Sequence, residues 1–412
     1  MSDDELRAKV EQIAGKTILS MTREKAIAPN KLGEAITREV LARFPEFAPE
    51  KRRSRRIGVV AAAALASSER RMIGTELPAP VPWTHFEEAL GGGLWPGVHV
   101  IVSGTGAGKS TLCTDIALHA AKEGHHVGYV SLELDENQIG HRFIGALTGT
   151  WFSKFTTGRQ TPDEHREAKI AAGKLEKLPI FIETAGPRGW HAEELTDLWE
   201  DMREGLPAKE TATTAEPYRT PVIIVDYLQL VTAKEDGRSE IRERVGQAAY
   251  AAHRLSTQYG AAVVLVSSIS RDNYPLVGEN NKARHDQHVK AERRPNGKDA
   301  DGKDLYLHDL VNSDALVGLG KESGEVEFAA TSVTTMVKVP RFVGDGGQAH
   351  RVLMLAKNRL GETSWTGLCL SEGTFKQADQ GKVTGALAEG GKPAVTPTTP
   401  PGPTHPTWTP MR

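Results

Sequence analysis

Residues 98–110 read Val-His-Val-Ile-Val-Ser-Gly-Thr-Gly-Ala-Gly-Lys-Ser. The apolar run Val98–Val102 is typical of a buried strand, and Thr111–Ala121 has the composition of a helix. Glycines between a strand and a helix let successive backbone N–H groups turn toward one phosphate, and the positive end of the helix dipole faces the same anion. The pattern therefore predicts a phosphate-binding loop in an α/β fold.

The positions of this loop have predicted roles toward ATP and Mg²⁺. Lys109 is expected to bridge the β- and γ-phosphates, and the Ser110 hydroxyl to ligate Mg²⁺. Ser103 stands where the pattern has its first glycine, and Gly104 beside it is expected to relax the turn. The candidate nucleotide-binding residues are Ser103, Gly104, Thr105, Gly106, Ala107, Gly108, Lys109, Ser110, Thr111 and Asp226.

Two further acidic residues follow apolar runs elsewhere in the chain. Asp226 ends the run Val222–Val225, and Glu133 follows the strand-like segment Tyr129–Leu132. Ligand sites of α/β folds lie at the carboxyl ends of parallel strands, so both carboxylates are expected beside the loop. Asp226 would complete the Mg²⁺ shell, and Glu133 would orient and deprotonate the attacking water.

The chain from about residue 85 to 376 alternates short β-branched runs with helical stretches, a pattern typical of a mostly parallel sheet with crossover helices. The helix with the clearest 3.6-residue period runs from Ile241 to Tyr259, and Gly260 is expected to end it. The last two runs are expected to form an added antiparallel portion. The predicted strands are Val98–Val102, Val127–Leu132, Ile180–Glu183, Val222–Val225, Ala261–Val266, Thr334–Val339 and Val352–Ala356.

The segments outside this core differ in composition. Residues 1–78 are expected to be a small helical region and linker, with Leu32, Ile36, Val40 and Phe44 on one helix face. Its basic run, residues 51–56, is either a solvated linker or a phosphate-binding patch. Prolines place a boundary within residues 75–84, so the core is assigned to residues 79–376. The Gly-, Thr- and Pro-rich tail, residues 377–412, is expected to be disordered.

Composition excludes several classes of protein. Lys and Arg number 51 against 53 Asp and Glu, so no whole-chain positive field attracts nucleic acid or anionic lipid. Cys113 and Cys369 are too few for a disulfide framework. The most apolar stretch, Ile57–Ala66, is about half of a membrane span. A cytoplasmic protein without membrane contact is expected.

Several motifs together resemble the ATPase domain of DnaB-type replicative helicases, in the RecA-like group. They occur in the family's order across roughly residues 80–376. The resemblance implies a RecA-like P-loop ATPase core, and a homo-oligomer, usually a hexameric ring, with ATP bound between neighbours. The matching strings are GGGLWPG at 91–97, SLEL at 131–134, VDYLQL at 225–230, SSISR at 267–271, KESGEVE at 321–327 and AKNRLG at 356–361.

In that family, a basic pair near the chain's last motif reaches the γ-phosphate held by the adjacent subunit. Lys357 and Arg359 match this pair. Since they lie two residues apart at the end of a predicted strand, their side chains are expected on the same face. They are therefore candidate catalytic residues together with Lys109 and Glu133, the alternative being two solvated basic residues at a hairpin tip.

The long polar segment between Arg271 and Lys321 bears on DNA binding. Residues 272–320 occupy the position of the family's channel loop, and Lys290, Arg293 and Arg294 are candidate contacts to single-stranded DNA. Acidic residues balance the charge of this segment, so a channel loop and a surface insertion both remain open.

The favoured interpretation is a Mg²⁺-dependent ATPase that moves along single-stranded DNA and unwinds duplex in replication. One departure from the family favours an alternative, because Ser268 stands where the family commonly has a glutamine that senses the γ-phosphate. The alternatives are an ATP-switched DNA-binding or recombination-mediator protein, and a regulatory ATPase that acts on protein partners.

Overall fold

The chain divides by its internal contacts into two units, Met1–Ser68 and Glu69–Arg412. Within the N-terminal stretch, Ile36 and Val40 are both helical, as their spacing predicts. The computed structural model describes residues 14, 36, 40, 54–186, 189–192, 194–204, 206, 208–209, 211–231, 241–269, 326, 329–339 and 349–378.

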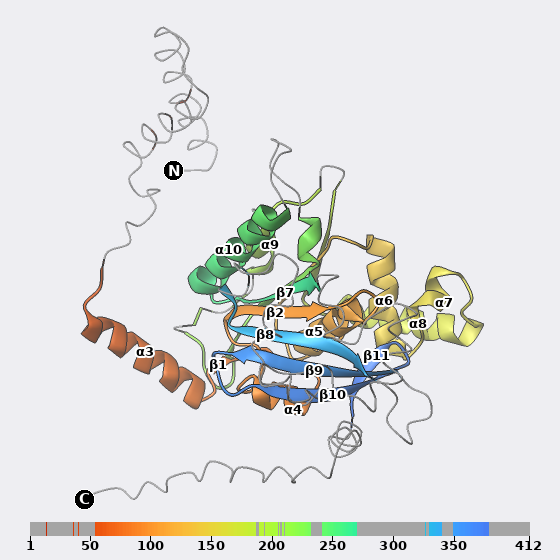
Figure 1. Ribbon diagram of the computed structural model, residues 1–412, viewed down its shortest axis with the longest axis horizontal. Coiled ribbons are helices and arrows are strands. Elements are labelled where there is room, and N and C mark those ends of the chain that lie inside the picture. Colours follow the sequence, from red (N-terminus) through yellow and green to blue (C-terminus); the bar gives the residue numbers. More distant parts are fainter. Residues whose placement is uncertain are drawn as a thin grey trace, which may run out of the picture. The chain divides into compact units, whose positions relative to one another are not determined.

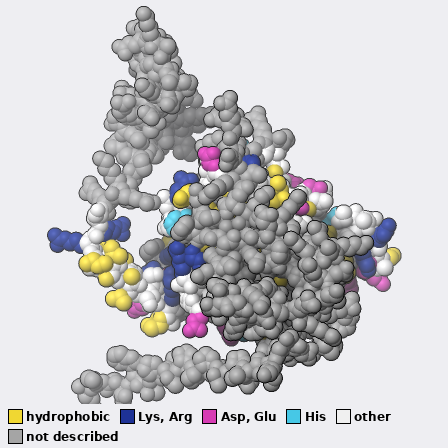
Figure 2. Space-filling model, in the orientation of Figure 1, with side chains coloured by type: hydrophobic (Ala, Val, Ile, Leu, Met, Phe, Trp, Pro, Cys, Tyr) yellow, Lys and Arg dark blue, Asp and Glu magenta, His cyan; other side chains and the backbone are white. Residues whose placement is uncertain are grey.

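Helix α3, Ile57–Met72, forms over the alanine-rich segment, as its composition predicts. None of its residues is buried, and Ile57, Leu65 and Met72 are at least 72% exposed. Figure 2 shows hydrophobic side chains gathered along the surface of this helix. No helix within the described ranges is both long and apolar enough to cross a membrane.

The described part of the Glu69–Arg412 unit is built on a nine-stranded sheet in the order β11-β10-β9-β8-β2-β7-β6-β3-β4 (Figure 1). All pairs from β8 to β4 are parallel, which confirms the predicted α/β class. The parallel strands are β2 (Gly97–Ser103), β3 (Val127–Ser131), β4 (Ile180–Thr184), β6 (Val222–Asp226), β7 (Ala262–Ser268) and β8 (Ser332–Val339).

The antiparallel portion is larger than predicted. β8 and β9, Ala349–Asn358, pair antiparallel as expected, and β8 also pairs parallel with β2, so it joins the two portions of the sheet. Two unpredicted strands, β10 (Ser364–Ser371) and β11 (Thr374–Gln377), extend the antiparallel portion. These strands have few β-branched residues, and the turn between them carries Gly373 with φ +82°, so the pattern used to find strands misses them.

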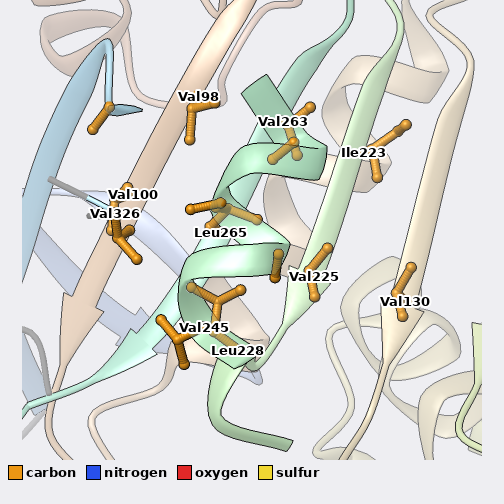
Figure 3. Close-up of a cluster of buried hydrophobic side chains, with 14 of the residues drawn as sticks. Val98, Val100, Val130, Ile223, Val225, Leu228, Val245, Val263, Leu265 and Val326 are labelled. Atoms are coloured by element: carbon orange, nitrogen blue, oxygen red, sulfur yellow. The ribbon is translucent and has the colours of Figure 1, made fainter. Parts of the chain in front are cut away.

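Helices cover both faces of the sheet. Side chains alternate along each buried strand, so each strand presents apolar residues to the helices on either face. Ile223 and Val225 of β6 pack toward α9 and α10, in the cluster shown in Figure 3, whereas Val222 and Ile224 pack toward α5 and α6. The helices of this unit are α4 (Thr84–Ala89), α5 (Lys109–Lys122), α6 (Glu136–Thr148), α7 (Phe152–Thr156), α8 (Pro162–Leu175), α9 (Glu194–Met202) and α10 (Ile241–Tyr259).

Helix α10 ends as predicted. Gly260 follows it with φ +70°, a left-handed conformation that glycine adopts without a Cβ clash. Helix α6 begins with a capping box, in which Asp135 and Gln138 bind each other's backbone N–H groups. The capping box therefore fixes the backbone at Asp135, two residues after Glu133.

Residues inside the expected 75–84 boundary belong to the Glu69–Arg412 unit. The short strand β1, Glu76–Leu77, pairs parallel with β5, Tyr218–Arg219. Trp83 is fully buried beside α4 and the C-terminal strands. The contact-based division falls earlier, between Ser68 and Glu69.

Candidate nucleotide-binding site

The predicted phosphate loop lies between β2 and α5. Its turn needs glycine, because Gly106 has φ +70° and Gly108, the residue before α5, has φ +107°. Ser103 needs none, since it is the buried last residue of β2, and among the described non-glycine residues only Glu372 has a positive φ. The departure at Ser103 is therefore compatible with the loop.

The amino end of α5 provides an anion site. No side chain in the described part of the chain caps this helix, so the N–H groups of its first turn and its positive dipole end are directed to the loop. Lys109 Nζ lies over the same turn, where it donates to the carbonyls of Ser103 and Gly104 at 3.3 and 3.0 Å. Thr105 and Gly106 form the exposed tip, while Ser110 and Thr111 are half-buried on the first turn of the helix.

Asp226 ends β6 directly opposite Ser131 of β3. Its side chain is 3% exposed, and Oδ2 accepts a hydrogen bond from the Tyr129 hydroxyl at 3.1 Å. Oδ1 is buried and has no hydrogen-bond partner among the described residues. Burial, followed by the charge of Asp226, raises the pKa of Cys113 on α5, so this carboxylate lies close to that helix. An unpaired carboxylate oxygen and the Ser110 hydroxyl are donors that fit Mg²⁺.

Glu133 lies at the same edge of the sheet, between the end of β3 and the start of α6. The turn is fixed by Ser131, whose hydroxyl donates to the Leu134 carbonyl at 2.8 Å. Glu133 itself is exposed. Burial, followed by the charges of Glu133 and Asp226, raises the pKa of Tyr227, so both carboxylates lie near that ring. The structure therefore brings the loop, Asp226 and Glu133 to one edge.

Lys357 and Arg359 lie toward the other edge. Lys357 pairs with Val333, which pairs with Val100 of β2. The backbone N–H of Arg359 donates to the Thr331 carbonyl, which belongs to the segment leading into β8. Val100 lies three residues before the end of β2, and Arg359 lies farther from that end than Lys357. At 3.3 Å per residue, the backbone of the pair is therefore roughly 10–20 Å from the loop.

The predicted common face of Lys357 and Arg359 stays a prediction. β9 ends at Asn358, so Arg359 lies one residue beyond it. The register shift lies before the pair, at Ala356, because Val333 pairs with Lys357 while Thr334 pairs with Leu355. This irregularity therefore does not fall between Lys357 and Arg359.

Two arginines near the loop were not foreseen. Arg351, at the start of β9, donates from Nε to the Ala107 carbonyl at 2.6 Å. Arg142 of α6 lies over the Phe152 ring at 4.1 Å, and its buried Nε has no hydrogen-bond partner among the described residues. A small pocket beside Arg142 is also lined by Thr111 and Thr114 of α5. The sequence signal for Arg142 was its place on the helix directly after Glu133, whereas Arg351 had none.

The end of β7 lies beside the start of the loop, because Ser268 pairs with Ser103. The Ser268 N–H donates to Gln229 Oε1 at 3.3 Å, and Gln229 Nε2 donates to the Ser267 hydroxyl at 2.9 Å. The side-chain amide of Gln229, three residues after Asp226, therefore lies at the end of β7. The DNA-binding candidates Lys290, Arg293 and Arg294 lie outside the described residues.

This arrangement agrees with the comparison with known families. The DnaB-like helicase C terminal domain family matches residues 83–278. Residues 83–278 are therefore similar to this domain, over just under half of the chain. The loop, Glu133 and Asp226 all fall inside the matched range of this DnaB-like domain.

Curated relatives cover the same part of the chain. A "Probable plasmid replicative DNA helicase" of Chlamydia psittaci is 26% identical over 175 residues, which are 42% of this chain and 34% of that protein. The "Replicative DNA helicase DnaB" of Geobacillus stearothermophilus is 21% identical over 193 residues, 47% of this chain and 39% of that protein. The similarity therefore spans little more than a third of these relatives' length.

Solved structures show the fold of the DnaB-like domain. One, described as a DnaB-like replicative helicase and its interactions with primase, superposes with a TM-score of 0.58 at 15% identity, over 90% of this chain and 75% of that one. A second, described as an ATPase domain, gives a TM-score of 0.54 at 16% identity, over 77% of this chain and 98% of that one. The predicted RecA-like α/β core is confirmed.

Proposed function

We propose that this chain is a Mg²⁺-dependent ATPase that acts as a DnaB-type helicase. Copies of the chain would assemble into a ring, as a hexamer, with ATP between neighbours. Hydrolysis would drive movement along single-stranded DNA and separation of duplex DNA during replication in the cytoplasm. The family match, the helicase relatives and the fold of the DnaB-like domain support this proposal.

The observation that carries the proposal is the division of the site between two edges of one sheet. The loop, Asp226 and Glu133 are together, but Lys357 and Arg359 are on the side away from them. A cation can act on the γ-phosphate only within contact distance. The basic pair therefore acts, in this proposal, on the nucleotide of a neighbouring copy.

Different residues of the chain perform different parts of ATP hydrolysis in this proposal. Loop N–H groups and Lys109 bind and orient the phosphates, and Ser110 with Asp226 Oδ1 holds Mg²⁺. When bound, the ion neutralises charge on the phosphate oxygens. Glu133 accepts a proton from the attacking water and orients it. The neighbour's Arg359 and Lys357 stabilise charge that develops on the γ-phosphate.

Arg142 is a further candidate contact to the nucleotide. The pocket that it lines includes Thr111, the residue after the predicted Mg²⁺ ligand Ser110. Its Nε is buried without a hydrogen-bond partner among the described residues, and an unmet donor of a guanidinium is costly unless an anion or acceptor binds there. A phosphate or ribose oxygen of ATP meets this requirement.

Two features bear on assembly and DNA. Exposed apolar side chains along α3 are typical of a surface that another protein chain covers. Residues 272–320, which include Lys290, Arg293 and Arg294, follow the end of β7 beside the loop and are assigned to the DNA-contacting segment of the ring. The chain's near-neutral charge makes this contact a local one.

The experiment is steady-state ATP hydrolysis by the purified chain, with and without single-stranded DNA, over a range of protein and salt concentrations. The proposal predicts turnover that rises more than linearly with protein and increases with DNA, followed by strand displacement from a forked duplex. ATP turnover that does not change with DNA would instead support the alternative of a regulatory ATPase that acts on protein partners.

Ser268 favours one second candidate, an ATP-switched DNA-binding or recombination-mediator protein. Its hydroxymethyl group is shorter than the family's glutamine, and its N–H is already bound to Gln229. Weak coupling between the nucleotide and DNA would give slow turnover and nucleotide-dependent assembly on DNA. Strand displacement separates the two candidates, because only the helicase shows it.

A further inference from the structure

The antiparallel strands contact the phosphate loop directly. Arg351 of β9 is 8% exposed, and its Nε donates to the Ala107 carbonyl at 2.6 Å. Ala107 is fully buried and lies between the two glycines with positive φ, Gly106 and Gly108. A hydrogen bond from a buried guanidinium is a charge-assisted one, so it strongly fixes the direction of this carbonyl.

A second contact lies beside the first. The Phe375 ring of β11 covers Gly108 so closely that a Cβ atom there would lie 2.8 Å from it. The Phe375 N–H donates to Asp115 Oδ2 of α5 at 2.7 Å, and the indole of Trp83 donates to the Phe375 carbonyl at 3.0 Å. The same strands therefore hold the loop and the helix that follows it.

The direction of the Ala107 carbonyl bears on phosphate binding. The Ala107–Gly108 peptide is trans, so its C=O and N–H point in opposite directions. While Arg351 holds the carbonyl, the Gly108 N–H is directed away from β9. A loop that binds phosphate needs its N–H groups turned inward and its carbonyls turned outward, because a carbonyl oxygen repels the anion.

We propose that Arg351 is a positioning residue of the nucleotide site, which holds the Ala107–Gly108 peptide with its N–H toward the phosphates. This rests on the proposed function, because it concerns the same site. In this proposal Arg351 acts through the loop and not by contact with the nucleotide. It also joins the loop to β9, whose other end leads to Arg359, the residue assigned to the neighbour's ATP.

The test is equilibrium binding of a fluorescent ATP analogue with Mg²⁺ to the full chain, together with thermal unfolding without nucleotide. Arg351→Gln removes the charged donor and is expected to weaken binding about tenfold, or about 1.4 kcal/mol. Arg351→Lys keeps the charge but replaces a planar fork with a point donor, and is expected to bind about threefold more weakly than the wild type.

Arg219→Gln is the matched control. Arg219 Nε donates to a backbone carbonyl, that of Glu123, at 2.8 Å, and it lies just before β6, at the edge away from the loop. Loss of this bond is expected to leave nucleotide affinity within about twofold of the wild type. An equal loss of affinity in Arg219→Gln and Arg351→Gln would overturn the proposal, since general destabilisation would then explain both.

Wild-type affinity in folded Arg351→Gln would also overturn it. If Arg351→Gln does not fold, the test uses Arg351→Lys. Wild-type affinity for the analogue in folded Arg351→Lys would then overturn the proposal. Failure of the wild type to bind the analogue would overturn the proposed function and this inference together. Tight wild-type binding with no effect of Arg351 would overturn this inference alone.

Discussion

The Tyr129 hydroxyl donates a hydrogen bond of 3.1 Å to Asp226 Oδ2 across the neighbouring strands β3 and β6. Burial, followed by the charge of Asp226, raises the pKa of Tyr129 well above its usual value, so the hydroxyl remains a donor at neutral pH. One carboxylate oxygen is thereby fixed, and Oδ1, which lacks a partner within the described residues, is the oxygen that the proposed function assigns to Mg²⁺.

Tyr129→Phe removes this hydroxyl and keeps the ring, which lies edge-on to Phe143 with centroids 5.9 Å apart. We expect the free energy of unfolding to fall by about 1–2 kcal/mol, because a buried hydrogen bond to a charged group is lost. The Mg²⁺ concentration for half-maximal ATP turnover should rise about tenfold. The control is Tyr250→Phe, which alters an exposed ring on α10. An unchanged Mg²⁺ requirement in Tyr129→Phe would contradict the role given to Asp226.

Glu133→Gln tests the assignment of the base. The amide keeps the shape of the side chain but accepts no proton, so turnover should fall by about 10²- to 10⁴-fold. Because Glu133 is exposed, stability should change by less than about 0.5 kcal/mol, and ATP binding should persist. Glu136→Gln, an exposed glutamate on the first turn of α6, should hydrolyse ATP normally. Wild-type turnover in Glu133→Gln would assign the base to another residue.

Much of the fold could be predicted because its strands are buried on both faces. Val222–Val225 is a continuous apolar run, Val98–Val102 is apolar except for His99, and each forms a central strand of the sheet. β10 and β11 were missed, since their place depends on contacts with residues distant in sequence. The Trp83 indole bond to Phe375 spans 292 positions, which no local pattern reveals.

The candidate site, like the fold, could be predicted from the sequence only where it is built from local motifs. The loop and the two strand-end carboxylates are local motifs, and the parallel sheet brings them to one edge. Arg351 reaches Ala107 across 244 positions, so only the sheet order places it there. The distance of Lys357 and Arg359 from the loop likewise depends on the order of β9, β8 and β2 in the sheet, which no local pattern reveals.

Asp115 predicts a dependence of stability on pH. It is 7% exposed, and burial raises its pKa to about 7, although the Phe375 N–H and Lys122 act in the opposite direction. The folded state thus holds a proton that the unfolded state, with a pKa near 3.8, releases. The contribution is fully present below about pH 4 and is lost as the pH rises toward 7, by up to about 4 kcal/mol.

Asp115→Asn isolates this contribution, because an amide does not titrate in this range. His99 and His125, whose pKa values burial lowers to about 4, act with the opposite sign in the same interval, so the wild-type curve alone is not informative. The difference in unfolding free energy, Asp115→Asn minus wild type, should increase between pH 4 and pH 7 in urea titrations. A difference independent of pH would show that Asp115 titrates normally in the folded chain.

The completion of each ATP site by a neighbouring copy is tested most directly by mixing two variants. Lys109→Ala lacks a phosphate contact of its own site, and Arg359→Ala lacks the cation offered to the neighbour's site. Each alone should hydrolyse ATP at under about 1% of the wild-type rate, since an in-trans arginine contributes about 10³- to 10⁵-fold.

The measurement is ATP turnover after the two variants are combined as dissociated subunits and allowed to assemble. In a random mixture about a quarter of the interfaces join an intact Lys109 site to an intact Arg359, so turnover should rise well above that of either variant. Turnover no greater than the sum of the separate variants, or wild-type turnover by Arg359→Ala alone, would contradict a site shared between subunits.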